Sequence, residues 1–243
     1  MDIYNAEFIK RLKIFVSKVD WIIPYEFYYH AEQDMDENRQ YLPPTTVMTD
    51  GIIFGDSRAA GGQWETNIRF LKPENENMKL INKSIGGTTI TDASQPPSIQ
   101  VLIGFNPKFY IQASGGNDLG AGTSYKKIMG DAFKIMYNLR KYNPGSKLFI
   151  HCVLPIIKHG SATNKNVIEL NNLLKLACQV MELDFIDFFN DFYDPATGWC
   201  KLEYLNLNEV PEWLWKKYTP VHFSEAGYQK WYELLNNYLA KFH

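Results

Sequence analysis

The chain has 243 residues, 45% of them hydrophobic and 21% charged, so it can bury the core of one α/β domain of ordinary size. Its formal net charge of −2 offers no basic surface for nucleic acid, which is therefore not an expected partner. The three cysteines (Cys152, Cys178 and Cys200) have neither the number nor the spacing of a disulfide framework or a zinc site, and we predict no metal site.

Residues 1–46 are predicted to form an N-terminal extension, and residues 47–243 the main domain. A short amphipathic helix is expected at 6–19. Its basic residues would suit a membrane surface, but a helix packed against the domain is the simpler interpretation. Charges interrupt its apolar positions, so the segment lacks the character of a signal peptide or a membrane span. As written, the chain is expected to be soluble and cytoplasmic.

From residue 47 onward, short apolar runs alternate with longer segments of helical period. This alternation is typical of a parallel sheet covered by helices on both faces. Candidate strands lie at 47–55, 78–84, 108–114, 147–154 and 183–188, and candidate helices at 124–142, 164–181 and 224–242. The last helix begins after Ser224, a plausible N-cap.

Ligands bind at the carboxyl ends of the strands in open α/β sheets, so the residues after each strand indicate the site. The first three candidate strands lead into Gly-Asp-Ser-Arg (55–58), Ser-Ile-Gly-Gly-Thr-Thr (84–89) and Ser-Gly-Gly-Asn-Asp (114–118). Ser57 is placed to act as a nucleophile. The backbone N–H groups of Ser57 and Gly87 and the side-chain amide of Asn117 can converge on an oxyanion.

A serine nucleophile needs a base, and His222 is the best placed of the five histidines. It lies in a loop directly before the last predicted helix, from which its imidazole can reach back to Ser57. The other histidines lie in the extension, within a predicted strand, in a polar loop and at the C-terminus.

The ordered set of motifs resembles the SGNH/GDSL hydrolase family over residues 47–242. Gly-Asp-Ser (55–57) is similar to the block that carries the nucleophile, and Ser-Ile-Gly-Gly (84–87) to the block that supplies a glycine oxyanion donor. Gly-Gly-Asn-Asp (115–118) resembles the block whose asparagine completes the oxyanion hole, and Val-His followed by Ser-Glu-Ala-Gly-Tyr resembles the block of the base.

This resemblance implies a flavodoxin-like, three-layer α/β/α sandwich with a central parallel sheet of about five strands. It also implies hydrolysis of esters or thioesters, commonly acetyl groups on carbohydrates or acyl chains on lipids, without a cofactor. Asp56 and Asp118 are expected to hold loop geometry through hydrogen bonds to the backbone and not to act on the substrate.

One position departs from the family pattern. The family carries an aspartate three residues before the histidine, and here that residue is Thr219, which cannot provide the charge that orients the imidazole. Three interpretations follow: a Ser-His dyad oriented by a backbone carbonyl, a carboxylate from elsewhere, or a site that no longer hydrolyses. Glu209 and Glu212 are the nearest acids, although either one alone is more typical of a solvated loop carboxylate.

Other side chains are candidates for substrate contact. Arg58 directly follows the nucleophile and could meet an anionic or polyhydroxyl substrate, or form a surface salt bridge. Trp64, with Trp199, Trp213 and Trp215, could form a wall on which a sugar stacks, although a single tryptophan is more often packed in a core.

The sequence thus favours a serine esterase that acts on an O-acetylated carbohydrate or a short acyl ester. Two alternatives stay open: a catalytically impaired carbohydrate-binding or interaction module on the same fold, and an acyltransferase. The sequence does not indicate the oligomeric state.

Overall fold

The computed structural model describes residues 7, 10–15, 18, 50–61, 80–157, 160, 162–214 and 219–242. Its centre is a five-stranded sheet in the order β2-β1-β3-β4-β5, with every neighbouring pair parallel. This is the flavodoxin-like strand order. The strands are β1 (Gly51–Gly55), β2 (Leu80–Asn82), β3 (Phe109–Ala113), β4 (Lys147–His151) and β5 (Asp184–Ile186). The predicted fold class is confirmed.

The strands form where the predicted apolar runs lie, but each described strand is shorter than its run; residues 47–49 and 78–79 of these runs lie outside the described residues. All five residues of β1 are buried, as expected for a strand covered on both faces. The run at 147–154 leaves the sheet after His151, because the backbone N–H and C=O of Val153 bond the Asn171 side chain instead of a neighbouring strand.

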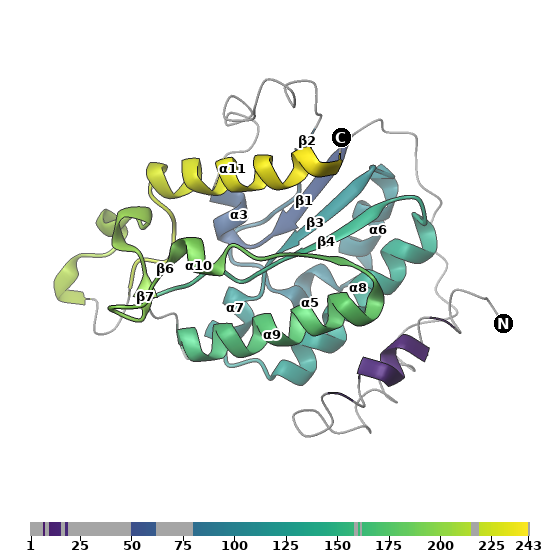
Figure 1. Cartoon of the computed structure of the whole chain (residues 1–243), viewed down its shortest axis with the longest axis horizontal. Helices are drawn as coiled ribbons and strands as arrows, with labels where there is room; N and C mark the ends of the chain where they lie inside the picture. Colours follow the sequence, from purple (N-terminus) through teal and green to yellow (C-terminus); the bar gives the residue numbers. More distant parts are fainter. Residues whose placement is uncertain are drawn as a thin grey trace.

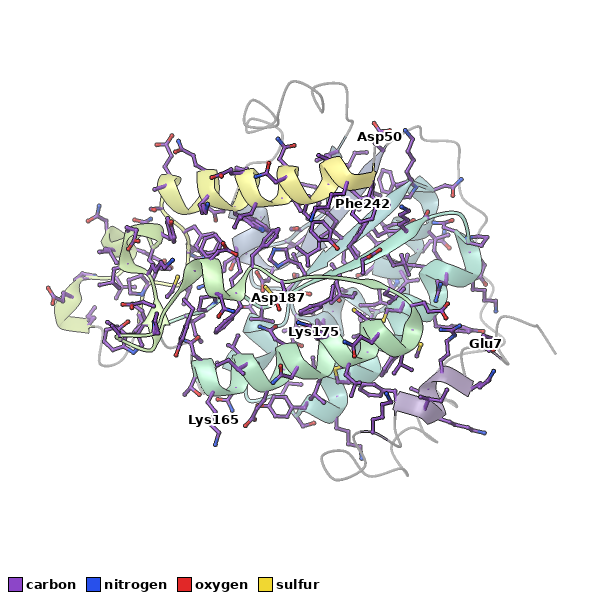
Figure 2. The ribbon with its side chains drawn as sticks, viewed as in Figure 1. Glu7, Asp50, Lys165, Lys175, Asp187 and Phe242 are labelled. Carbon is purple, nitrogen blue, oxygen red and sulfur yellow. The ribbon has the colours of Figure 1, made fainter. Side chains whose placement is uncertain are left out.

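Helices cover both faces of the sheet (Figure 1). On one face lie α8 (Tyr125–Tyr142) and α9 (Asn164–Met181), and on the other lie α3 (Ser57–Gly61) and α11 (Glu225–Leu239). The predicted N-cap of α11 is confirmed, because the Ser224 hydroxyl accepts from the N–H of Gly227. Side chains from both layers fill the space beside the sheet in Figure 2, where Phe242, just beyond α11, is labelled; its ring lies 5.1 Å from that of Phe149 in β4.

Several short elements were not predicted. They are α5 (Ile90–Ala93), α6 (Pro96–Phe105), α7 (Gly116–Gly120), α10 (Phe189–Phe192), the hairpin β6 (Tyr193–Asp194) with β7 (Trp199–Cys200), and the 3₁₀ turns η3 (Leu202–Tyr204), η4 (Leu207–Glu209), η5 (Glu212–Leu214) and η6 (Ala240–Phe242). Elements this short have too few residues to show a hydrophobic period. Most of those after β5 lie within residues 187–217, a segment rich in acidic and aromatic residues that precedes His222.

The described residues of the predicted N-terminal helix (Glu7, 10–15 and Lys18) are helical. Leu12 and Phe15 are buried, and the Phe15 ring packs edge-on against Phe133 of α8 at 4.9 Å. Arg11 donates to the carbonyl of Val180 in α9. This helical segment therefore packs against the domain, and the rest of the extension lies outside the described residues. Within the described part of the chain, no helix is both long and apolar enough to cross a membrane.

Candidate active site

Ser57 lies at the carboxyl end of β1, where the chain turns from the sheet into α3. Gly55, just before this turn, lies directly against β3. A Cβ atom on this glycine would be 2.0 Å from the carbonyl oxygen of Ala113. The Asp56 carboxylate accepts from the N–H of Arg58 at 3.0 Å, so its predicted role in loop geometry is confirmed. Burial raises the pKa of Asp56 to about 6.

The loop after β2 is fixed beside Ser57. Both the N–H of Ile85 and the hydroxyl of Thr88 donate to the carbonyl of Gly55 at 3.1 Å. A Cβ atom on Gly86 would lie 3.9 Å from the Cβ of Ser57, which shows how closely the loop passes the serine. Gly87 has a φ of +81°, in the left-handed region that glycine adopts without strain.

The loop after β3 meets the same loop from its other side. The Asn117 Nδ2 donates to the carbonyl of Thr88 at 2.9 Å, which places the amide next to Gly87. The Asp118 carboxylate accepts from the N–H of Ile90 at 2.9 Å, so its predicted role in loop geometry is also confirmed. The three predicted loops therefore meet at one edge of the sheet.

His222 is paired with a carboxylate that lies thirteen residues earlier in the chain. The Nδ1 atom of His222 is 2.7 Å from Oε1 of Glu209, while Oε2 of Glu209 accepts from the N–H groups of Val221 (3.1 Å) and His222 (3.0 Å). A carboxylate only accepts hydrogen bonds, so Nδ1 carries the proton and Nε2 is the basic nitrogen. The two side chains are partly exposed, 39% for His222 and 23% for Glu209.

Backbone pairing carries Glu209 to this position. Leu205 and Phe223 form an antiparallel bridge, and the N–H of Asn206 donates to the carbonyl of His222 at 2.9 Å. The turn η4 follows at once and ends on Glu209, whose side chain folds back over the paired segment. Glu212, by contrast, is exposed in the next turn, η5.

Arg58 connects α3 to the loop that carries His222. Its Nε donates to the carbonyl of Val221 at 2.5 Å, and its guanidinium lies 4.9 Å from the centre of the Phe223 ring. Its Nη1 donates to the carbonyls of Leu154 (3.1 Å) and Pro155 (3.0 Å). The residue after Ser57 thus contacts both residues that flank His222.

A small cavity of about 50 Å³ opens beside Ser57. Asn117 and Ser114 contribute polar groups to its wall, and Val153, Leu154 and Ile156 contribute apolar ones. An apolar cavity of this size accommodates only a few non-hydrogen atoms.

His151 also lines this cavity, from the end of β4. It is buried, and its Nε2 accepts from the indole N–H of Trp231 in α11 at 2.8 Å. An indole only donates, so Nδ1 carries the proton that it shares with the carbonyl of Cys152 at 2.6 Å. Burial lowers the pKa of His151 to about 4, so it is neutral at pH 7.

The predicted aromatic wall is described only in part. Trp199 is 41% exposed on β7, whereas Trp64, Trp215 and the side chain of Trp213 lie outside the described residues. No group of three or more histidine, cysteine or acidic residues gathers as a metal site among the residues that the structure describes.

The model of the GDSL-like lipase/acylhydrolase family matches residues 53–230, a range that contains Ser57, Gly87, Asn117, Glu209 and His222. The chain belongs to this family. It is therefore a serine hydrolase that acts on ester bonds, as the motifs predicted.

Solved structures show that this GDSL-family chain shares its fold with other hydrolases. One of them, from Bacteroides fragilis, is named an acylhydrolase; it aligns with a TM-score of 0.63 and 19% sequence identity. The alignment covers 86% of this chain and 94% of the other chain. A GDSL-like lipase from Bacteroides thetaiotaomicron has a TM-score of 0.63 and 16% identity, over 80% and 89%. No curated protein sequence matches the chain.

Proposed function

We propose that this GDSL-family hydrolase cleaves short acyl esters, with O-acetyl groups on carbohydrates as the preferred class, through an acyl-enzyme on Ser57. The observation that carries the proposal is the contact of His222 Nδ1 with the Glu209 carboxylate at 2.7 Å. It provides an oriented base on a loop that Arg58, the neighbour of Ser57, holds through Val221. An activated serine requires such a base, and the base requires such a partner.

In the first step, Nε2 of His222 takes the proton of the Ser57 hydroxyl as Oγ attacks the ester carbonyl carbon. The tetrahedral intermediate collapses, the bond to the alcohol oxygen breaks, and that oxygen takes the proton from His222. Water then attacks the acyl-enzyme with His222 again as the base. The acid is released, and Ser57 regains its proton.

The oxyanion of the intermediate needs donors that are already in place. We assign this role to the backbone N–H groups of Ser57 and Gly87 and to the amide of Asn117. One N–H of that amide donates to Thr88, and an amide nitrogen carries two. The contact with Thr88 therefore orients the second N–H of Asn117.

Glu209 takes the place of the missing aspartate. Of the three interpretations that Thr219 left open, a carboxylate from elsewhere in the chain has the support of the geometry, since the partner of Nδ1 is a side-chain carboxylate and not a backbone carbonyl. This contact also argues against a site that has lost its means of activating serine.

The size of the cavity supports a small acyl group. Drug-sized ligands occupy pockets of about 300–1,000 Å³, whereas the cavity at Ser57 measures about 50 Å³. Val153, Leu154 and Ile156 would contact the methyl group of an acetyl ester and obstruct a long chain. A series of p-nitrophenyl esters from acetate to octanoate should give the highest kcat/KM at two to three carbons.

The Ser57→Ala variant tests the proposal. It should keep its fold by circular dichroism and lose turnover of p-nitrophenyl acetate by at least about 10³-fold, because no other group in the proposed mechanism attacks the ester. A fluorophosphonate probe should label the wild-type protein and not this variant. Unchanged turnover in the variant would contradict the proposal. A folded wild-type protein that resists labelling would favour the interaction module.

A further inference from the structure

A single guanidinium joins three segments of the active site. Arg58 belongs to the first turn of α3, and its Nη1 reaches the carbonyls of Leu154 and Pro155 in the loop after β4. Its Nε reaches the carbonyl of Val221, and its charged plane lies over Phe223. These contacts use the planar arrangement of donors that distinguishes arginine from lysine.

The peptide group between Val221 and His222 lies between a cation and an anion. Its carbonyl oxygen accepts from Arg58 Nε, and its N–H donates to Oε2 of Glu209 at 3.0 Å. Hydrogen bonds to charged groups are stronger than neutral ones, and donors and acceptors in a chain polarise one another. The backbone of His222 is therefore fixed from both sides, while the same carboxylate holds its ring through Nδ1.

Arg58 is also covalently close to the nucleophile. Only one peptide bond separates it from Ser57, and the N–H of Arg58 is itself held by the buried carboxylate of Asp56. A shift of the His222 loop away from Ser57 would thus have to break the contact of Arg58 with Val221. The loop of Leu154 and Pro155 is held by the same side chain, and Leu154 belongs to the cavity wall.

We propose that Arg58 is a positioning residue that fixes the distance between His222 and Ser57, and not a substrate contact; this inference rests on the proposed function. Two of its nitrogens, Nε and Nη1, already donate to backbone carbonyls, while Nη2 is buried and has no hydrogen-bond partner among the described residues. Because Arg58 also lines the cavity beside Ser57, the effect of its replacement on KM distinguishes a positioning role from a substrate contact. Catalysis by a serine and a base depends steeply on their alignment, and a displacement of about 1 Å can cost about 100-fold in rate.

The Arg58→Lys variant tests the assignment, because lysine keeps the charge but cannot bond three carbonyls in these directions. We expect kcat for p-nitrophenyl acetate to fall about 10- to 100-fold, KM to change less than about threefold, and the rate of fluorophosphonate labelling to fall with kcat. The matched control is Arg140→Lys: Arg140, in the last turn of α8, also donates to a backbone carbonyl, that of Met181, and its replacement should leave kcat unchanged.

A double variant separates positioning from general loss of stability. If Arg58 and Glu209 both act through the orientation of His222, Arg58→Lys should reduce kcat much less in a Glu209→Gln background than in the wild type. Independent, multiplicative losses would overturn the inference. If Arg58→Lys does not fold, Arg58→Gln, which keeps planar N–H donors without the charge, replaces it with the same expected split between kcat and KM.

The outcomes are distinguishable from a failure of the proposed function. If Ser57→Ala abolishes turnover and Arg58→Lys leaves kcat intact, the proposed function stands and the role of Arg58 is wrong. A rise in KM at constant kcat would identify Arg58 as a substrate contact. If Ser57→Ala retains turnover, the proposed function fails, and the inference about Arg58 falls with it.

Discussion

The carboxylate of Glu209 makes three hydrogen-bonded contacts with Val221 and His222, which defines a prediction for this single residue. In Glu209→Gln, the amide can still meet Nδ1, but it cannot stabilise an imidazolium and it can favour the wrong tautomer. The corresponding change of aspartate to asparagine in a serine protease lowers kcat about 10⁴-fold. We expect a fall of about 10³- to 10⁴-fold in kcat for p-nitrophenyl acetate, with KM little changed.

Glu212→Gln is the matched control for this change. Glu212 lies only three residues further along the chain, but its side chain is exposed in η5. Its replacement should leave kcat within about twofold of the wild type. Equal losses in the two variants, or full activity in Glu209→Gln, would contradict the assignment of Glu209 and return the site to a dyad.

The sequence was informative about single residues where a motif follows a strand. Ser57, Gly87 and Asn117 each come directly after a predicted strand, so the parallel sheet alone places them at one edge. Glu209 was not separable from Glu212, because neither belongs to a periodic segment. Its position depends on the bridge between Leu205 and Phe223, a contact that no local pattern encodes.

At the scale of elements, the close approach of β1 to β3 predicts that Gly55 cannot be replaced. A Cβ atom at this position would lie 2.0 Å from the carbonyl oxygen of Ala113, which belongs to the backbone and cannot rotate away. Gly55→Ala must therefore push β1 and β3 apart, at the point where Ser57 lies beside the loops that follow β2 and β3. We expect a loss of at least about 3 kcal/mol in the free energy of unfolding, measured by urea denaturation.

Gly104→Ala serves as the control for this prediction. Gly104 lies within α6, and a Cβ atom there would have no heavy atom within 4 Å apart from adjacent residues and the backbone of its own helix. Alanine favours a helix over glycine by about 0.5–1 kcal/mol, so this variant should be slightly more stable than the wild type. If Gly55→Ala were as stable as Gly104→Ala, the close packing of β1 on β3 would be wrong.

The long elements were predictable, and the short ones were not. Apolar runs mark the five strands. A clear helical period and recognisable caps mark the helices α8, α9 and α11. The segment from α10 to η5 has neither, and its shape depends on contacts with α11 and the His222 loop, such as the hydrogen bond from Ser224 N–H to the carbonyl of Tyr204. That segment nevertheless supplies Glu209, the partner of His222, which we propose as the base.

At the scale of the whole molecule, one buried pair joins the sheet to an outer layer. His151 ends β4, Trp231 lies in the middle of α11, and the indole N–H donates to His151 Nε2 at 2.8 Å. The contact requires a neutral imidazole, since a protonated ring would have no acceptor at Nε2. The packing of α11, which begins just after His222, is thus linked to the protonation state of His151, which lines the cavity.

This linkage predicts how stability depends on pH. The pKa of His151 is lowered from 6.5 to about 4 in the folded chain, so the unfolded chain binds this proton more readily. The contribution of His151 to stability is therefore fully present above about pH 6.5. It is lost as the pH falls from there through about 4, and the total loss in the free energy of unfolding is at most about 3 kcal/mol. Asp56 acts in the opposite sense, because its raised pKa gives a contribution that is present at low pH and lost as the pH rises through about 6.

Comparing the stability of the wild type with that of His151→Gln isolates the contribution of His151 to the pH dependence. Asp56 is present in both proteins, so its contribution cancels in the difference. Glutamine can accept from Trp231 through its carbonyl oxygen but does not titrate. We expect the wild type to be the more stable protein at pH 8, by urea denaturation. The gap should shrink, or reverse, as the pH is lowered to 4.5, because only the wild type must then keep a buried imidazole unprotonated. A gap that stays constant from pH 8 to 4.5 would show that His151 does not link the packing of α11 to pH.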